Sequence, residues 1–298
     1  MSIIERAAGR IEPNKQSQAA TAAVKDRVPE PALEPIKSAE AIVAPPTPAN
    51  RQNNRTVEID IEQLHKLGMV TPDAARTSIA EEFRLIKRPL IEKAFNQKNK
   101  PIRHGNLIMV ASSLPGEGKT FCAVNLAISI AMELDHTVLL VDADVARPSV
   151  PRYLQIKTPS DANEIGLMDV LLDDSLDLAD AMLRTNIDTL SILRAGRSHP
   201  RATELLASQG MSALLDEIAT RYPDRIVIFD SPPLLLTTEA RVLAGQMGQI
   251  VLVVEAEATT QHAVKEVLRQ IKSCQNINLI YNKARTLSNG DYYGRYYG

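Results

Sequence analysis

The stretch LIMVASSLPGEGKTFCAVNLAISIAM, residues 107–132, decides the fold of this 298-residue chain. It begins with an apolar run, residues 107–110, that is short enough for a buried strand. A turn containing proline and glycine follows, and a long apolar helix opens at Lys119. A strand, a loop of small residues and a helix in this order are the layout of a phosphate-binding P-loop. We therefore predict a nucleotide site at this turn.

The loop residues suit phosphate chemistry. Small residues let backbone N–H groups curl around phosphate oxygens, and the helix N-terminus adds positive potential. Lys119 reaches the β and γ phosphates, and the Thr120 hydroxyl can hold Mg²⁺. Ser113 replaces the first glycine of G-x-x-x-x-G-K-[ST], and a strand-to-helix turn that binds nothing is the alternative. The expected nucleotide contacts are Ser113, Pro115, Gly116, Glu117, Gly118, Lys119, Thr120 and Phe121.

Acidic residues follow two further apolar runs. Residues 138–141 are followed by Asp142 and Asp144, and residues 226–229 are followed by Asp230. An open α/β sheet places its ligand chemistry at the carboxyl ends of parallel strands. The first pair could instead cap a helix, whereas Asp230 has the form of a Walker B acid that supports Mg²⁺ through water. The three strand ends, in this order, make a strong combined signal for a nucleotide site.

Strands and helices alternate along the rest of the chain. This alternation predicts βαβ units, and hence an α/β fold with a doubly wound, mainly parallel sheet of the P-loop NTPase type. Further helices are expected at 71–95, 166–174, 202–222, 237–247 and 259–273, and further strands at 189–193, 249–257 and 276–284.

Composition excludes several classes of protein. The 34 basic and 36 acidic residues give no general case for a nucleic-acid partner. Cys122 and Cys274 are far apart and are expected to be buried thiols in a reducing compartment. The chain has no run of about 18 apolar residues and no signal-peptide core, so we expect a cytoplasmic protein without a transmembrane segment of its own.

The N-terminal part differs from the rest. Seven of the 18 prolines lie in the first 50 residues, and no aromatic residue precedes Phe83. Such a composition buries too little apolar surface to offset chain entropy. We therefore predict a flexible arm over 1–75, either a solvated tail or a tether to a partner, and a catalytic domain over 76–285.

The C-terminal segment, residues 286–298, ends in YYGRYYG. Glycines make such a segment flexible, and little apolar surface is available to order it, so we expect exposed phenols. The tail could dock on a partner as an aromatic patch. In a chain with a P-loop, its hydroxyls are also candidate phosphate acceptors, namely Tyr292, Tyr293, Tyr296 and Tyr297.

Together these motifs resemble a known family. The P-loop with PGEGKT, the strands ending in DAD and DSPP, and the tyrosine-rich terminus look like the bacterial tyrosine autokinases, over roughly residues 76–298. Members of that family are cytoplasmic P-loop kinases that work with membrane proteins controlling exopolysaccharide chain length. The run VLLVDADVARP, the arm and YYGRYYG are most similar to the exosortase-associated branch.

The resemblance implies a role for each motif residue. Lys119 would neutralise the β and γ phosphates of ATP, and Thr120 would coordinate Mg²⁺. Asp142 and Asp230 would complete the metal shell, directly or through water. Asp144 would take the phenolic proton or orient the incoming tyrosine. Asn282, after the last strand, resembles the family position beside the adenine.

The resemblance also implies a ring-shaped homo-oligomer in which one chain's tail enters a neighbour's site. The family's subunit-contact motif E-x-x-R-x-x-R is present as Glu81, Arg84 and Lys87, and lysine loses the guanidinium fork of the last arginine. The family's D-x-D-x-R motif also departs, because Ala146 occupies the arginine position and Arg147 comes one residue late.

Two rival functions remain. A positioning or partition ATPase of the MinD/ParA type would carry a signature lysine early in the loop, where this chain has Leu114. A non-catalytic, nucleotide-dependent scaffold of a polysaccharide export complex would bind ATP without transferring phosphate. Leu114 and the tyrosine tail favour the kinase over the positioning ATPase, whereas the scaffold, whose tail would dock to the export complex, is separated from the kinase only by phosphate transfer from Mg·ATP.

Overall fold

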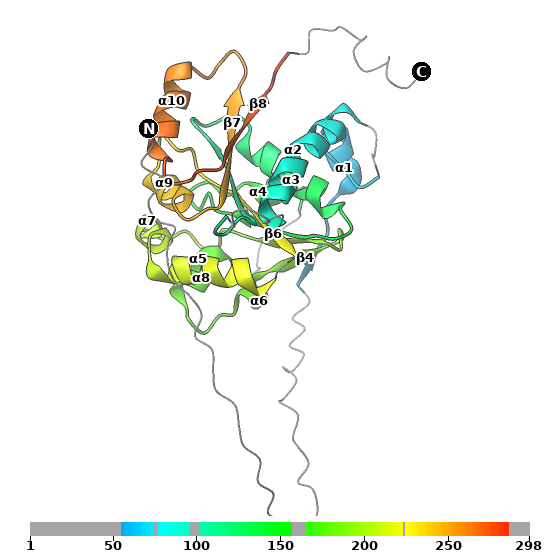
Figure 1. The fold of residues 1–298 in the computed structure, drawn as a ribbon. Coiled ribbons are helices and arrows are strands. Elements are labelled where there is room, and N and C mark those ends of the chain that lie inside the picture. The colour runs from blue at the N-terminus through cyan, green and yellow to red at the C-terminus, as the bar shows by residue number, and fades with distance from the viewer. Residues whose placement is uncertain (1–54, 74–76, 96–101, 157–164, 223, 286–298) are drawn as a thin grey trace, which may run out of the picture. The chain divides into compact units, whose positions relative to one another are not determined.

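The computed structural model describes residues 55–73, 77–95, 102–156, 165–222 and 224–285. Within them a mainly parallel, eight-stranded sheet carries helices on both faces (Figure 1). The predicted α/β class and doubly wound sheet are therefore confirmed. The predicted arm up to residue 54 and the predicted tyrosine tail lie outside the described residues.

The sheet brings the three motif strands together at its centre. The strands are β1 (Thr56–Val57), β2 (Leu107–Ser112), β3 (Thr137–Asp142), β4 (Leu183–Thr185), β5 (Leu190–Leu193), β6 (Arg225–Asp230), β7 (Gln249–Glu255) and β8 (Ile277–Asn282). Their order across the sheet is β1-β4-β5-β3-β6-β2-β7-β8, and only the β4–β5 pair is antiparallel. Because β3, β6 and β2 are parallel neighbours, their carboxyl ends meet at one edge.

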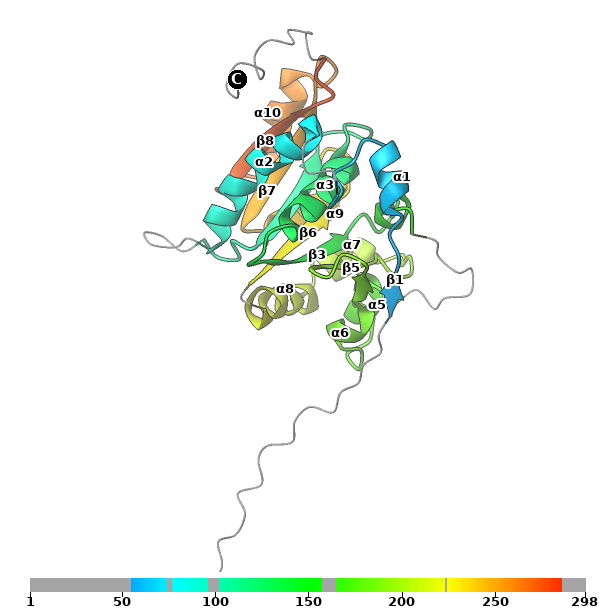
Figure 2. The same cartoon turned by 90° about the vertical axis from the view of Figure 1, so that its right-hand side faces the viewer.

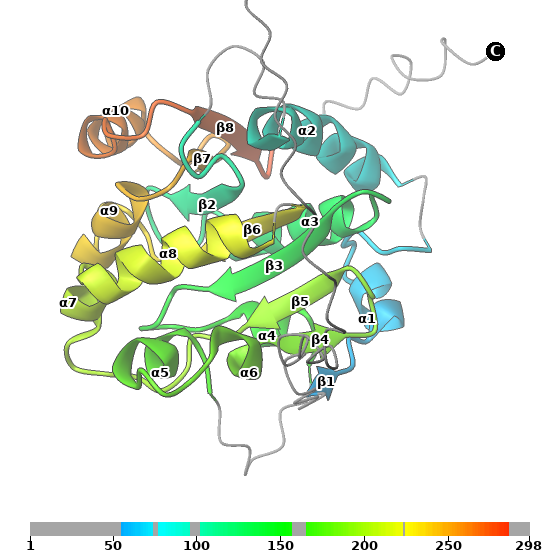
Figure 3. The ribbon, with the colours of Figure 1, turned by 60° about the horizontal axis from the view of Figure 1, so that its bottom comes forward.

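The helices divide between the two faces of the sheet. They are α1 (Ile61–Lys66), α2 (Ser78–Phe95), α3 (Lys119–Ala131), α4 (Val150–Tyr153), α5 (Leu167–Leu172), α6 (Leu178–Ala181), α7 (Ala202–Leu206), α8 (Gln209–Arg221), α9 (Thr238–Ala244) and α10 (Gln261–Gln270). Helices α1 to α4 pack on one face (Figure 2). Helices α5 to α10 pack on the other, where α8 runs across the sheet (Figure 3). None of these described helices is long and apolar enough to cross a membrane.

The alternation of side chains along each strand creates these two cores. In β2, Leu107, Met109 and Ala111 join the core under α5 to α10. Ile108 and Val110 join the core under α1 to α4. Helices cover both faces of this sheet, so the strand side chains on both faces must be apolar. The central strands are therefore continuous apolar runs and do not alternate between apolar and polar residues.

The folded part begins earlier than predicted. Residues 55–73, assigned from their sequence to the arm, include β1 and α1, and Ile59 and Leu64 are fully buried. The backbone N–H of Val70 donates to Asn125 Oδ1 on α3 at 2.6 Å. The boundary at residue 75 is therefore wrong for this segment. A two-residue strand and a six-residue helix are too short to give a periodic pattern, so tertiary contacts decide their structure.

The helix predicted over 202–222 is two helices, α7 and α8. Ser208 lies between them in an extended conformation, and its side chain accepts a hydrogen bond from the backbone N–H of Met211 at 3.1 Å. Serine competes for backbone groups in this way, which makes it a good N-cap and a poor interior helix residue. The apolar pattern continues across the break, so the pattern alone does not reveal it.

The Asn125 contact predicts the cost of detaching residues 55–73. Replacement of Asn125 by alanine leaves the buried N–H of Val70 without its acceptor, which costs about 1–3 kcal/mol of unfolding free energy. The measurement is chemical denaturation, with limited proteolysis to show cleavage near residue 70. As a control, Gln209→Ala on the exposed start of α8 should stay within about 0.5 kcal/mol of wild type. Equal stability of the two variants would contradict the assignment.

Candidate active site

A cavity of about 500 Å³ lies at the carboxyl ends of β2, β3 and β6, where the sequence predicted the nucleotide site. The P-loop forms one wall, the segment from Asp144 to Tyr153 a second, and the segment from Pro232 to Thr237 a third. Of the predicted site residues, it brings together Pro115, Gly116, Gly118, Lys119, Thr120 and Asp144.

The backbone of the P-loop requires glycine at two positions. Gly116 has φ 89° and Gly118 has φ 99°, in the left-handed region that other residues avoid. A Cβ at Gly118 would also lie 2.1 Å from Asn282 Nδ2. These constraints hold the loop in the form that opens directly into α3.

Lys119 lies between two carboxylates. Its Nζ is 3.0 Å from Asp144 Oδ2 and 3.5 Å from Asp230 Oδ1. Burial alone would lower the pKa of the ammonium, but Asp230 and Asp144 outweigh this effect and raise the pKa above its usual value. The lysine is therefore fully charged at neutral pH.

Thr120 connects the start of α3 to Asp230. Its hydroxyl donates to Asp230 Oδ2 at 2.6 Å and lies 3.1 Å from Ser149 Oγ. Burial raises the pKa of Asp230 to about 6, against the opposing effects of Lys119 and Thr120. The hydroxyl and carboxylate that were predicted to hold a metal are thus adjacent.

Asp142 is buried at the end of β3. Its Oδ2 accepts backbone N–H groups from Ser149 at 2.8 Å and Val150 at 2.9 Å, whereas its Oδ1 is buried without a hydrogen-bond partner among the described residues. Burial, followed by the charge of Asp230, raises the pKa of Asp142 to about 7. A cation at this point would relieve both the orphaned oxygen and the repulsion.

These residues fit Mg²⁺. Magnesium keeps several waters and is held by one or two carboxylates together with substrate phosphates, rather than by a full protein cage. Thr120, Asp142 and Asp230 supply oxygen ligands of that kind. Over the described ranges no group of three or more histidine, cysteine, aspartate or glutamate residues has metal-holding geometry.

Four residues predicted to contact the nucleotide do not line the cavity. Ser113 and Glu117 are buried residues of the loop itself. Phe121 lies in a separate hollow beside Leu67 and Met69. Asn282, expected beside the adenine, donates its amide to the backbone oxygen of Glu117 at 2.8 Å. The sequence pattern of a P-loop identifies the loop but does not say which side chains face away from the ligand.

The predicted subunit-contact residues fall into two groups. Glu81 and Arg84 lie on the outer side of α2 and form an ion pair with each other. Lys87 is buried, donates to the backbone oxygen of Ser129 and pairs with Glu133 Oε1 at 2.6 Å. The expectation that Lys87 is a subunit contact is corrected here, because its ammonium ties α2 to α3. The four tail tyrosines lie outside the described residues.

Several residues of the cavity wall were not predicted from the sequence. Ser149 contacts Thr120, and Arg152 and Tyr153 of α4 face the cavity with Leu236 and Thr237. No motif marks them. The only signal for Ser149 is its position shortly after the DAD segment, on the chain that turns back over Asp142.

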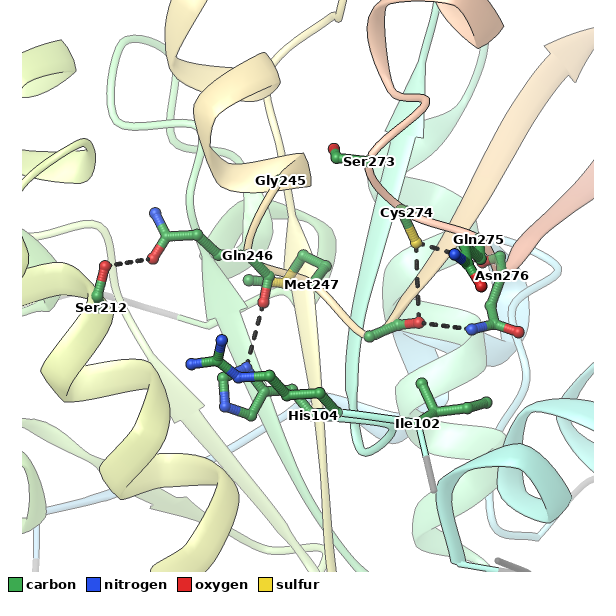
Figure 4. Close-up of a pocket in the computed structure, with 12 residues that line it drawn as sticks. Ile102, His104, Ser212, Gly245, Gln246, Met247, Ser273, Cys274, Gln275 and Asn276 are labelled. Carbon is green, nitrogen blue, oxygen red and sulfur yellow. Dashed lines mark hydrogen bonds between the residues drawn. The ribbon is translucent and has the colours of Figure 1, made fainter. Parts of the chain in front are cut away.

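Another cavity, of about 620 Å³, lies at the opposite, amino ends of β2, β7 and β8 (Figure 4). It contains none of the predicted site residues. Several of its polar groups form hydrogen bonds. His104 Nδ1 lies 3.3 Å from the backbone oxygen of Gln246, and His104 Nε2 lies 2.7 Å from Asp216 Oδ1. The Gln246 side chain also accepts a hydrogen bond from the Ser212 hydroxyl. The phosphate chemistry therefore belongs to the other edge of the sheet.

Comparison with known proteins agrees with this geometry. The profile of the AAA domain family matches residues 105–283. The tyrosine-protein kinase YwqD of Bacillus subtilis is 30% identical over 79% of this chain and 92% of its own. The succinoglycan biosynthesis transport protein ExoP of Rhizobium meliloti is 27% identical over 80% of this chain but 30% of its own length. The solved kinase domain of VpsO aligns with a TM-score of 0.55 at 28% identity, over 74% of this chain and 97% of that domain.

The raised pKa of Asp142 predicts that its ionised carboxylate destabilises the folded protein when no cation is bound. Below about pH 3 Asp142 is protonated in both the folded and unfolded states. As pH rises from about 4 towards its folded pKa of about 7, the unfolded chain releases a proton that the folded site retains, so the folded state loses stability relative to the unfolded chain, and the loss is complete once the folded site ionises as well. Asp142→Asn keeps an oxygen acceptor for Ser149 and Val150 and lacks this penalty.

In metal-free buffer at pH 8 we therefore expect Asp142→Asn to be more stable than wild type by about 1–3 kcal/mol, and the difference to vanish near pH 3. Thermal unfolding at the two pH values checks this. If the stability difference between the two proteins does not change with pH, the pKa of Asp142 is not raised in the folded protein.

Proposed function

Because the chain belongs to the family of bacterial tyrosine-protein kinases, we propose that it transfers the γ-phosphoryl group of ATP to tyrosines of its own C-terminal tail. The observation that carries this proposal is the arrangement around Lys119, whose ammonium lies beside Asp144 and Asp230 at the mouth of a P-loop. A phosphate cradle, two carboxylates and a hydroxyl for a metal, and a carboxylate at the entrance are the groups that phosphoryl transfer needs.

The side chains divide the work. Lys119 leaves Asp144 for the β and γ phosphates when ATP enters, which frees Asp144 Oδ2 to accept a proton. The tyrosine oxygen then attacks the γ-phosphorus, the bond to the bridging oxygen of ADP breaks, and the phenolic proton passes to Asp144. Thr120, Asp142 and Asp230 would hold Mg²⁺, which would neutralise charge on the phosphates. Positioning and charge account for most of the rate, so these few groups suffice.

The acceptors are Tyr292, Tyr293, Tyr296 and Tyr297, and transfer occurs between subunits of a homo-oligomeric ring. Each phosphotyrosine adds about −1.5 to −2 charge. Several on one tail repel one another and loosen the assembly, so phosphorylation works as a switch on oligomer state.

The process that the kinase regulates is the synthesis or export of an exopolysaccharide. ExoP, named for succinoglycan biosynthesis transport, supports this at 27% identity. We place the chain in the cytoplasm, recruited to the inner face of the membrane by a polysaccharide co-polymerase partner. The assignment to the exosortase-associated branch stays a prediction from the arm and the YYGRYYG ending.

A complementation assay tests transfer and its direction together. One variant, Lys119→Met, has an intact tail but no phosphate-binding ammonium. The other has all four tail tyrosines replaced by phenylalanine but an intact site. Each alone with Mg·ATP should gain no tail phosphate by intact mass, whereas the mixture should phosphorylate the Lys119→Met chain.

The other outcomes each identify a rival. If the wild-type chain is phosphorylated but the mixture of the two variants gains no tail phosphate, transfer occurs within one chain. ATP binding without any transfer favours the scaffold, and DNA-dependent ATP hydrolysis favours a positioning ATPase.

Mutations of the surface pair Glu81 and Arg84 and of the buried Lys87, all on α2, should have different effects. Arg84→Ala should lower the oligomer mass measured by light scattering and leave the melting temperature near that of wild type. Lys87→Ala removes the tie to Ser129 and Glu133, so it should cost about 1–2 kcal/mol of unfolding free energy. If the oligomer mass of Arg84→Ala equals that of wild type, α2 does not form the proposed subunit interface.

A further inference from the structure

Glu117 is an acid in the middle of a loop built for anions. Its carboxylate stands close to where phosphates bind, and a fixed negative charge there would repel them. Yet the residue is only 3% exposed, and it does not line the cavity. A buried carboxylate persists only when hydrogen bonds compensate it, so its partners reveal its role.

Both oxygens of Glu117 are occupied. Oε2 accepts the backbone N–H of Leu114, three residues earlier in the same loop, at 2.8 Å. Oε1 accepts the hydroxyl of Thr259, which lies in the turn between β7 and α10. The Thr259 Oγ1 in turn accepts the backbone N–H of Glu255, at the end of β7, at 3.1 Å. The chain of bonds therefore runs from the end of β7 through Thr259 into the P-loop.

Two further contacts join the same parts of the molecule. Asn282 Nδ2 donates to the backbone oxygen of Glu117 at 2.8 Å. Lys283 Nζ donates to the backbone oxygen of Gly116 at 2.7 Å and pairs with Glu255 Oε1 at 3.0 Å. Thr259, Asn282 and Lys283 thus each donate to an oxygen of the loop, and none of the three lines the cavity. Backbone N–H groups are what a loop of this kind presents to phosphates, so oxygens that are held elsewhere suit that form.

We propose that Glu117 is a positioning residue, which holds the P-loop in its phosphate-binding form by fastening it to Thr259. The inference rests on the proposed function only in that the loop binds ATP. Its contribution is to nucleotide affinity and not to the chemical step, because neither Glu117 nor Thr259 faces the site of phosphoryl transfer.

The experiment measures binding of Mg·ADP by calorimetry and, separately, KM and kcat for tail phosphorylation. Glu117→Ala and Thr259→Val should each weaken Mg·ADP binding about tenfold and raise KM with kcat retained. Their combination should lose no more than Glu117→Ala alone, because the bond that Thr259→Val removes is already broken in Glu117→Ala. Glu117→Gln should bind within about threefold of wild type, since its amide can accept from Leu114 and donate to Thr259. Thr259→Ser, which keeps the hydroxyl, should also bind like wild type.

The matched control is Thr260→Val. Thr260 caps α10 through the N–H of Ala263 and has no bond to the P-loop, so the variant should lower the melting temperature by about 2–4 °C with unchanged Mg·ADP affinity. Wild-type affinity in Glu117→Ala or Thr259→Val would overturn the proposal, as would additive losses or an equal loss in Thr260→Val. If Glu117→Ala fails to fold, Thr259→Val decides. The binding pattern without tail phosphorylation would contradict the proposed function and leave this inference standing.

Discussion

The site depends on one ammonium group that compensates several buried carboxylates. Asp142 and Asp230 are fully buried at the ends of neighbouring strands, and Asp144 is nearly so. Lys119 contacts two of the three directly. Parallel strands force these acids together, because residues at matching register positions such as Asp142 and Asp230 pair across the sheet. The fold thus concentrates negative charge, and the ammonium of the P-loop lysine compensates part of that charge.

The sequence predicted this arrangement well, for a physical reason. The motif strands are short apolar runs ending in acids, and burial on both faces of the sheet demands such runs. The glycine pattern of the loop reflects two left-handed backbone positions that the structure contains at Gly116 and Gly118. Fold class, central strands and the residues around Lys119 could therefore be derived from local features alone.

Features that depend on long-range contact escaped prediction. The docking of residues 55–73 depends on Asn125, whose side chain satisfies a backbone group 55 residues earlier. Lys87 has the same spacing as its exposed neighbours on α2, yet it is buried because Ser129 and Glu133 receive its ammonium. Glu117 was expected to face the nucleotide, but it is buried, and its carboxylate accepts a hydrogen bond from Thr259 in the turn after β7. In each case the deciding partner is distant in sequence.

The contact between Lys283 and the P-loop has a geometric consequence for any assembly of this chain. Because the side chain of Lys283 is fastened at Gly116, the chain beyond it has a fixed origin at the nucleotide site. Tyr292 follows nine residues later and Tyr297 fourteen, and fully extended chain covers at most about 3.6 Å per residue. The contour length therefore limits the tail phenols to about 30–50 Å from their own P-loop. For the proposed transfer between subunits, neighbouring active sites would have to lie within that radius, which would set an upper limit on the spacing of subunits in such an assembly.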